Sequence, residues 1–207
     1  MAAHPPFQSR IIITIDGPAG TGKSTVAHLL AKRLGLEFLD TGAMYRAAAV
    51  IAIEASVSPD DGPALAEGVR DADLRFDWKA DPPRLLVGDR DVSRRTRDMD
   101  VSGIVSIVAA QSELRRVLVQ QQRRIAQRHS RLVSEGRDQG SVVFPDASVR
   151  FYLHAEVDVR ANRRAAQLPA AGKAVDPQRV VRDIQEPDRL DASRVDGPLV
   201  RPQGAMH

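Results

Sequence analysis

The residues best suited to chemistry are a glycine-rich run that ends in Lys23, Ser24 and Thr25. From Gly17 to Ser24 the spacing is G-x-x-x-x-G-K-S/T, the pattern of a phosphate-binding loop. Its glycines let backbone N–H groups turn inward, and a following helix would add the positive end of its dipole. The run therefore predicts a site for the phosphates of ATP or GTP, with Lys23 on the outer phosphates and the Ser24 hydroxyl on Mg²⁺. The expected donor-binding residues are Gly17, Pro18, Ala19, Gly20, Thr21, Gly22, Lys23, Ser24 and Thr25.

The sequence on either side of this loop predicts a strand before it and a helix after it. Residues 11–15 are mostly β-branched and apolar, as in a buried strand, and residues 26–34 have a helical spacing that stops at Gly35. A second strand is expected at 36–39, and Asp40 would open a second helix. A chance turn that carries a lysine is disfavoured, because it would lack both flanking elements. The order strand, loop, helix, strand, helix predicts an α/β fold with a parallel sheet.

The rest of the chain contains further strands and helices. Prolines and glycines concentrate between residues 58 and 97, where the runs 74–76 and 85–87 are expected to pair as antiparallel strands of a small insert. Ser112 is expected to cap or break the helical stretch 100–128. The later elements are expected in this order: strands at 131–134 and 149–153, a helix at 156–168, a loop at Pro169–Gly172, and a helix from Asp176 that Pro187 should end.

Composition narrows the classes of function. The 207 residues carry a net charge of +3 and 4% aromatic residues, which does not suit a nucleic-acid binder. All but four of the 30 basic residues are arginine, the better bidentate ligand for phosphate, so small anionic substrates are expected. The chain has no cysteine and no apolar run long enough to span a membrane. Residues 1–10 lack the apolar region of a signal peptide and are expected to be a disordered lead-in to a cytoplasmic protein.

Three motifs with several charged residues lie where strands are expected to end. They are DTGAMYR at 40–46, EGRDQG at 135–140, and the stretch 188–194, in which Asp191 and Arg194 are three residues apart. Open α/β sheets place ligands at the carboxyl ends of their strands. A single arginine is most often a solvated surface residue, but an arginine beside an aspartate in a strand-end glycine turn favours an anion site.

Together these motifs resemble those of bacterial cytidylate kinases. The resemblance rests on the phosphate loop, DTGAMYR, the segment from Val108 to Arg115, EGRDQGSVVFPDA at 135–147 and D-x-x-R-x-x-x-P-L from Asp191, and it covers about residues 11–200. It implies a nucleoside monophosphate kinase fold, three-layer α/β/α with a five-stranded parallel core. The implied single domain, 11–207, has a core at 11–40 and 129–160, a monophosphate-binding region at 41–128 with an insert at about 58–97, and a lid at 161–187.

The resemblance also implies an activity and residue roles. The reaction would be phosphoryl transfer from ATP with Mg²⁺ to CMP or dCMP, in pyrimidine nucleotide metabolism, by a monomer. Lys23 would be catalytic, together with Arg160, Arg163 and Arg164 on the helix that enters the lid. The implied acceptor-binding residues are Thr41, Arg46, Arg137 and Arg194 at the phosphate, Ser106, Arg115 and Asp138 at the cytosine edge, and Asp191 at the ribose.

The sequence departs from this family in two places. When the chain is aligned on Asp191 and Arg194, the family has an arginine where this chain has Pro187, and that arginine would contact the acceptor. After Leu199 the family continues with a strand and a helix that are expected to be missing here. Two alternatives therefore stay open: another small-molecule P-loop kinase, such as an adenylate or shikimate kinase, and a nucleotide-binding protein with impaired catalysis.

Overall fold

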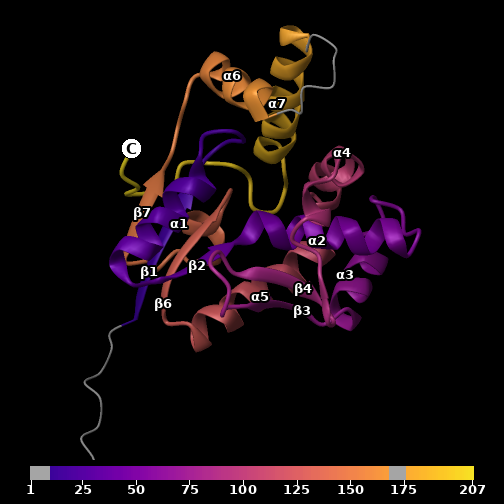
Figure 1. Cartoon of the computed structure of the whole chain (residues 1–207), viewed down its shortest axis with the longest axis horizontal. Coiled ribbons are helices and arrows are strands. Elements are labelled where there is room, and N and C mark those ends of the chain that lie inside the picture. Colours follow the sequence, from indigo (N-terminus) through magenta and orange to yellow (C-terminus); the bar gives the residue numbers. More distant parts are fainter. Residues whose placement is uncertain (1–9, 168–175) are drawn as a thin grey trace, which may run out of the picture.

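A four-stranded parallel sheet lies at the centre of the molecule (Figure 1). The computed structural model describes residues 10–167 and 176–207; the predicted lead-in at 1–9, the end of the predicted helix at Leu168 and the predicted loop Pro169–Gly172 lie outside the described residues. The strand order is β2-β6-β1-β7. These strands are β1 (Ile11–Asp16), β2 (Glu37–Asp40), β6 (Arg131–Gly136) and β7 (Val149–Tyr152). The predicted α/β class with a parallel sheet is confirmed.

Alternation along the strands gives the sheet two apolar faces. Ile13, Phe38 and Val133 are buried on one face, against Ala27 and Ala31 of helix α1 (Lys23–Leu34). Their chain neighbours on the other face join a larger cluster with helices α2 (Thr41–Glu54) and α5 (Ser112–Arg128). The sheet is thus covered on both sides, as the predicted three-layer arrangement requires.

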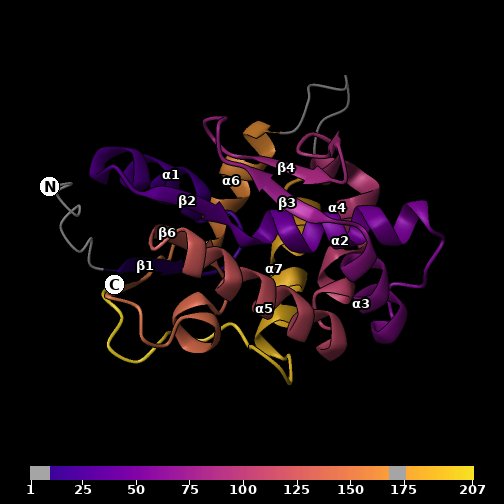
Figure 2. The same cartoon turned by 90° about the horizontal axis from the view of Figure 1, so that it is seen from below.

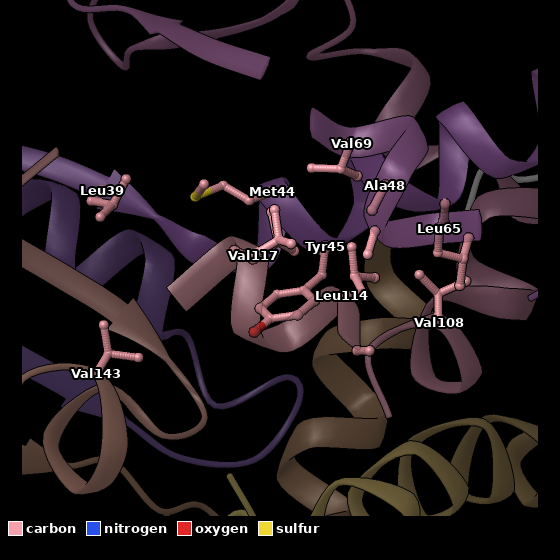
Figure 3. Close-up of a cluster of buried hydrophobic side chains, with 14 of the residues drawn as sticks. Leu39, Met44, Tyr45, Ala48, Leu65, Val69, Val108, Leu114, Val117 and Val143 are labelled. Carbon is pink, nitrogen blue, oxygen red and sulfur yellow. The ribbon is translucent and has the colours of Figure 1, made fainter. Parts of the chain in front are cut away.

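The larger cluster extends beyond the sheet (Figure 3). Met44, Tyr45 and Leu114 are buried there together with Leu65 and Val69 of helix α3 (Gly62–Asp71). The sequence did not predict α3, because its ten residues lie among prolines and glycines that indicate turns. The helix forms because the Asp61 carboxylate accepts a hydrogen bond from the Ala64 N–H (3.0 Å) and its apolar side packs into this cluster.

The insert forms a second, antiparallel sheet, which Figure 2 shows beside α2. Its strands are β3 (Leu74–Asp77), β4 (Arg84–Val87) and the two-residue β5 (Arg90–Asp91). The predicted pairing of 74–76 with 85–87 is confirmed, with Phe76 opposite Leu85. A 3₁₀ turn at Arg95–Arg97 and helix α4 (Met99–Val108) lead to α5. The expected break in the helical stretch is confirmed, but the N-cap of α5 is Gln111, and Ser112 is its first helical residue.

Helices α6 (Val157–Gln167) and α7 (Pro177–Ala192) project together from one end of the molecule (Figure 1), and we call this pair the lid. The expectation that Pro187 ends the helix is wrong, because α7 continues to Ala192. A proline removes one backbone hydrogen bond and crowds the preceding turn. Burial of Val180 and Ile184 against Ala161 of α6 offsets that loss.

The last described residues run along the free edge of β7. Met206 pairs with Phe151 in a single parallel bridge, with the Tyr152 N–H donating to the Met206 carbonyl (2.8 Å) and the Met206 N–H to the Arg150 carbonyl (2.9 Å). The sheet of the described residues has four strands, and this single bridge is the only further pairing at its edge, so the five-stranded core implied by the resemblance is not formed by them. None of the helices within residues 10–167 and 176–207 combines the length and apolar character needed to cross a membrane.

Candidate active site

The phosphate loop joins β1 to α1. Gly17 has φ +149°, and a Cβ there would lie 2.1 Å from the Leu153 carbonyl oxygen, so only glycine fits. Gly22 has φ +93° and is the residue before α1. The loop residues Thr21 and Lys23 are buried, whereas Ser24 and Thr25 are exposed at the start of α1. The spacing predicted from sequence therefore folds into a strand, loop and helix.

Lys23 is buried inside the loop, and within residues 10–167 and 176–207 it forms no ion pair with a carboxylate. Its Nζ donates to the Pro18 carbonyl oxygen (2.7 Å), which also accepts from the Thr21 hydroxyl (3.1 Å). Burial, followed by the positive charge of Arg137, lowers the pKa of Lys23 to about 7. A polyphosphate would restore the charged form, because it brings negative charge to an ammonium group that now has only a neutral acceptor.

Glu135 lies at the end of β6, next to the start of α1. Its carboxylate accepts a hydrogen bond from the Ser24 hydroxyl (2.8 Å), and its carbonyl accepts one from the Thr41 hydroxyl (2.7 Å). Burial, followed by the negative charge of Asp40, raises the pKa of Glu135 to about 7. A hydroxyl and a carboxylate are the oxygen ligands that Mg²⁺ prefers, so these residues suit the ion expected at Ser24. Asp40 also pairs weakly with Arg46 (3.5 Å).

The turn after β6 is held by a second buried carboxylate. Asp16, at the end of β1, accepts hydrogen bonds from the N–H groups of Gln139 and Gly140, both at 2.7 Å. Burial nevertheless raises the pKa of Asp16 to about 6. These bonds fix the backbone from which Arg137 and Asp138 project, so the donor loop and the predicted acceptor motif share one rigid support.

Two clusters bring most of the predicted acceptor residues together. In the first, Asp191 of α7 pairs with Arg137 through its Nε (2.8 Å) and with Arg194. In the second, Arg115 and Asp138 form a buried ion pair, and the Arg115 guanidinium lies 5.4 Å from the centre of the Tyr45 ring. Ser106 is half-buried on α4, and among the described residues its hydroxyl joins neither cluster.

Gly197 covers the second cluster. Its φ is +64°, and a Cβ there would lie 2.2 Å from Arg115 Nη2 and 2.3 Å from Asp138 Oδ2. Arg115 and Asp138 are consequently only 3% and 2% exposed. The backbone after α7 therefore has to move before a ligand can reach this pair.

We expect Gly197→Ala to lower the free energy of unfolding by about 1–3 kcal/mol, because the new methyl group overlaps the buried pair. Gly88→Ala is the matched control, since Gly88 also has a positive φ (+57°) but has no neighbouring atom within 4 Å. Thermal unfolding measures both variants. Equal losses would mean that backbone strain, and not overlap with Arg115 and Asp138, causes the effect.

The predicted lid arginines differ in their contacts. Arg160 is buried and donates to the carbonyls of Ala155 (3.0 Å) and Ala19 (2.9 Å), and Arg163 donates to the Thr21 carbonyl (3.1 Å). Arg164 is exposed and has no ion pair among the described residues. Two of the three arginines therefore contact the phosphate loop directly.

Sequence reasoning missed two carboxylates of this site, Glu135 and Asp188. Glu135 could have been found, since it ends a strand inside the EGRD motif. Asp188 accepts a hydrogen bond from the Ala19 N–H (2.8 Å) and pairs with Arg160 (2.5 Å). No sequence signal identifies that contact, because 169 positions separate Asp188 from Ala19.

Comparison with known proteins agrees with these motifs. A family model described as cytidylate kinase matches residues 13–207. The cytidylate kinase of Mycobacterium leprae (strain Br4923) is 42% identical over 200 residues, which cover 95% of this chain and 86% of that protein. The cytidylate kinase of Geobacter sp. (strain M21) is 38% identical over 199 residues, covering 96% and 85%. That of Pelotomaculum thermopropionicum (strain DSM 13744 / JCM 10971 / SI) is 45% identical over 190 residues, covering 91% and 83%. With this agreement over nearly its whole length, the chain belongs to the cytidylate kinase family.

Proposed function

We propose that this protein transfers the terminal phosphoryl group of ATP to CMP or dCMP, giving CDP or dCDP. The observation that carries the proposal is the closeness of the two phosphate-binding sides. Glu135 joins them, because it accepts hydrogen bonds from Ser24 of the donor loop (2.8 Å) and from Thr41, expected beside the acceptor phosphate (2.7 Å). Two polyanions could meet between these two sides, as direct transfer requires.

On the donor side, the phosphate loop and Lys23 hold the phosphates of ATP. Ser24 and Glu135 are the residues that would hold Mg²⁺, and the ion would neutralise negative charge that develops on the donor phosphates during transfer. Glu135 accepts a hydrogen bond from Ser24 and is buried, so both oxygens face the same place. Neither residue needs to act as a base, since the acceptor phosphate is already anionic.

On the acceptor side, we assign Arg46, Arg137 and Arg194 to the phosphate of CMP, with Thr41 beside it. Asp191, which now pairs with Arg137 and Arg194, would bind a ribose hydroxyl once the phosphate takes over those arginines. Arg115 and Asp138 would read the donors and acceptors of the cytosine edge, with Ser106 joining them from α4.

The lid would complete the site. Arg160 and Arg163 already reach the carbonyls of Ala19 and Thr21, from which a short rearrangement brings their guanidinium groups to the transferring phosphoryl group. Arg164 is assigned the same role from the exposed side of α6. Closure of α6 and α7 excludes water, which would otherwise accept the phosphoryl group.

The test is an ADP-release assay with CMP, dCMP, UMP, AMP and shikimate as acceptors. We expect turnover with CMP and dCMP at a kcat/KM well above that for AMP and shikimate. A preference for AMP would overturn the cytidine assignment. ATP binding without turnover of any acceptor would instead indicate a catalytically impaired nucleotide-binding protein.

Pro187 gives a prediction about the strength of acceptor binding. Pro187→Arg restores the donor groups that the family has at this position, so we expect KM for CMP to fall about tenfold, the effect of one charged hydrogen bond. Gln185→Arg is the control, because it adds the same charge at an exposed position of α7. If both variants leave KM unchanged, Pro187 does not lie where the alignment places it.

We further propose that the protein acts in pyrimidine nucleotide metabolism in the cytoplasm, where its proposed substrates are found, and that it works as a monomer. Sedimentation at concentrations used for the assay measures the oligomeric state, and a stable dimer would contradict the monomer.

A further inference from the structure

Both helices of the lid contact one residue of the phosphate loop, Ala19, through its N–H and its carbonyl, and Arg163 adds a contact to the Thr21 carbonyl. The Ala19 N–H donates to Oδ1 of Asp188 on α7 (2.8 Å), and the Ala19 carbonyl accepts from Arg160 Nη1 of α6 (2.9 Å). The same Arg160 nitrogen donates to Oδ2 of Asp188 (2.5 Å). Ala19, Arg160 and Asp188 thus form a closed ring of three contacts, which we call the clasp.

The clasp uses groups that phosphate binding needs. Backbone N–H groups of a phosphate loop bind oxygens of the donor, and Ala19 belongs to that loop, so its N–H is expected to be available to the donor. In this structure it is bound to a carboxylate. Arg160, expected at the transferring phosphoryl group, is likewise bound to that carboxylate, with 5% of its side chain exposed.

A donor phosphate and the Asp188 carboxylate would compete for these groups. Each is an anion that accepts hydrogen bonds from the same N–H and the same guanidinium, and their charges repel at such short range. The phosphate would therefore displace the carboxylate, and Arg160 would pass from Asp188 to the phosphoryl group.

We propose that the Asp188 carboxylate holds the lid on the phosphate loop until the donor binds. The donor phosphate then displaces this carboxylate from the Ala19 N–H, and Arg160 moves from Asp188 to the phosphate. The proposal rests on the proposed function for the role of ATP, and it assigns Asp188 as a positioning residue. While Asp188 occupies the loop, the donor cannot bind there. The apparent Kd for the donor is therefore the intrinsic Kd divided by the fraction of molecules in which the clasp is open.

Replacing Asp188 by asparagine tests this competition. Asp188→Asn keeps the size of the side chain but removes the charge that competes with phosphate. We expect the Kd for ATP, and for the base-free probe tripolyphosphate, to fall about 3- to 10-fold, as when an open fraction of 10–30% becomes fully open. Isothermal titration calorimetry without any acceptor measures both.

Glu186→Gln is the matched control. Glu186 lies two residues earlier on α7 and pairs only with Arg189 among the described residues, so its charge is lost without touching the loop. We expect its Kd values to equal those of the unmodified protein. Unchanged or weaker binding in Asp188→Asn would overturn the proposal, because a merely structural contact gives no gain in affinity when it is weakened.

A second measurement uses the unmodified protein and does not depend on the folding of a variant. The carboxyl carbon of Asp188, followed by NMR, is expected to change its chemical shift when tripolyphosphate is added. No change would overturn the proposal. Both measurements report donor binding alone. If both give the expected results but the protein does not phosphorylate CMP, the proposed function is contradicted, whereas the proposal about Asp188 is still supported.

Discussion

Replacement of Lys23 by alanine is expected to lower kcat/KM for ATP about 10³-fold. Lys23 is the buried cation of the phosphate loop, and it would stabilise charge on the outer phosphates as the phosphoryl group moves. Among the described residues, the hydrogen-bond acceptor of its Nζ is the neutral Pro18 carbonyl. The ammonium group is therefore ready to bind an anion, and no other side chain of the loop carries a positive charge.

The ADP-release assay measures this loss, and Lys32→Ala is the control. Lys32 lies on the same helix, but its side chain is 67% exposed and pairs with Asp81 of the insert. We expect it to retain nearly the full rate. A Lys23→Ala variant within tenfold of the unmodified protein would mean that catalysis depends mainly on the lid arginines.

Glu135→Gln is expected to lower turnover about 100-fold while making the unliganded protein more stable at pH 8. Turnover falls because the amide lacks the negative charge that would help Ser24 to hold Mg²⁺. Stability rises because an ionised carboxylate is no longer buried. The opposite signs of these effects separate a catalytic loss from a folding defect.

The pH dependence of this stabilisation follows from the raised pKa of Glu135, about 7 in the folded protein against 4.5 in the unfolded chain. Below pH 4.5 both states are protonated, and the group does not oppose folding. As the pH rises from 4.5 through 7, only the unfolded chain loses its proton readily, so the free energy of unfolding falls. Above pH 7 this loss reaches its full value, at most about 3 kcal/mol.

Thermal unfolding at pH 5 and pH 8 measures the difference. Glu135→Gln should exceed the unmodified protein in Tm by several degrees at pH 8 and by much less at pH 5. Glu156→Gln, whose side chain is 84% exposed, serves as the control and should change neither Tm nor turnover. An equal gain at both pH values would show that the Glu135 charge is not the cause.

Local patterns in the sequence were enough to predict the donor site. The G-x-x-x-x-G-K-S/T spacing, an apolar strand before it and a helix after it determine a phosphate loop through contacts between near neighbours, such as Lys23 with Pro18. The apolar, β-branched run at 11–15 and the order of strands and helices likewise predicted a parallel sheet with buried strands. The hairpin pairing of β3 with β4 was also predictable, because a short turn joins two β-rich runs.

Local patterns failed where tertiary packing outweighs propensity. Pro187 is a helix breaker by itself, yet α7 continues past it because Val180 and Ile184 are buried against α6. Helix α3 lies among turn-forming residues and forms because Leu65 and Val69 fill the large apolar cluster. In both cases the free energy gained by burying apolar side chains exceeds the cost of unfavourable helix propensity, which is a few kcal/mol at most.

The amino-acid sequence by itself determined the family, the donor loop and the residue types of an acceptor pocket, because these depend on motifs and spacing. Only the tertiary structure decided which charged and polar side chains contact one another. Asp188 reaches Ala19 across 169 positions, Ser24 reaches Glu135 across 111, and Gly197 covers Arg115 and Asp138. Contacts of this kind depend on how α7 and the backbone after it dock on the sheet, and burial then sets the pKa values of Lys23 and Glu135.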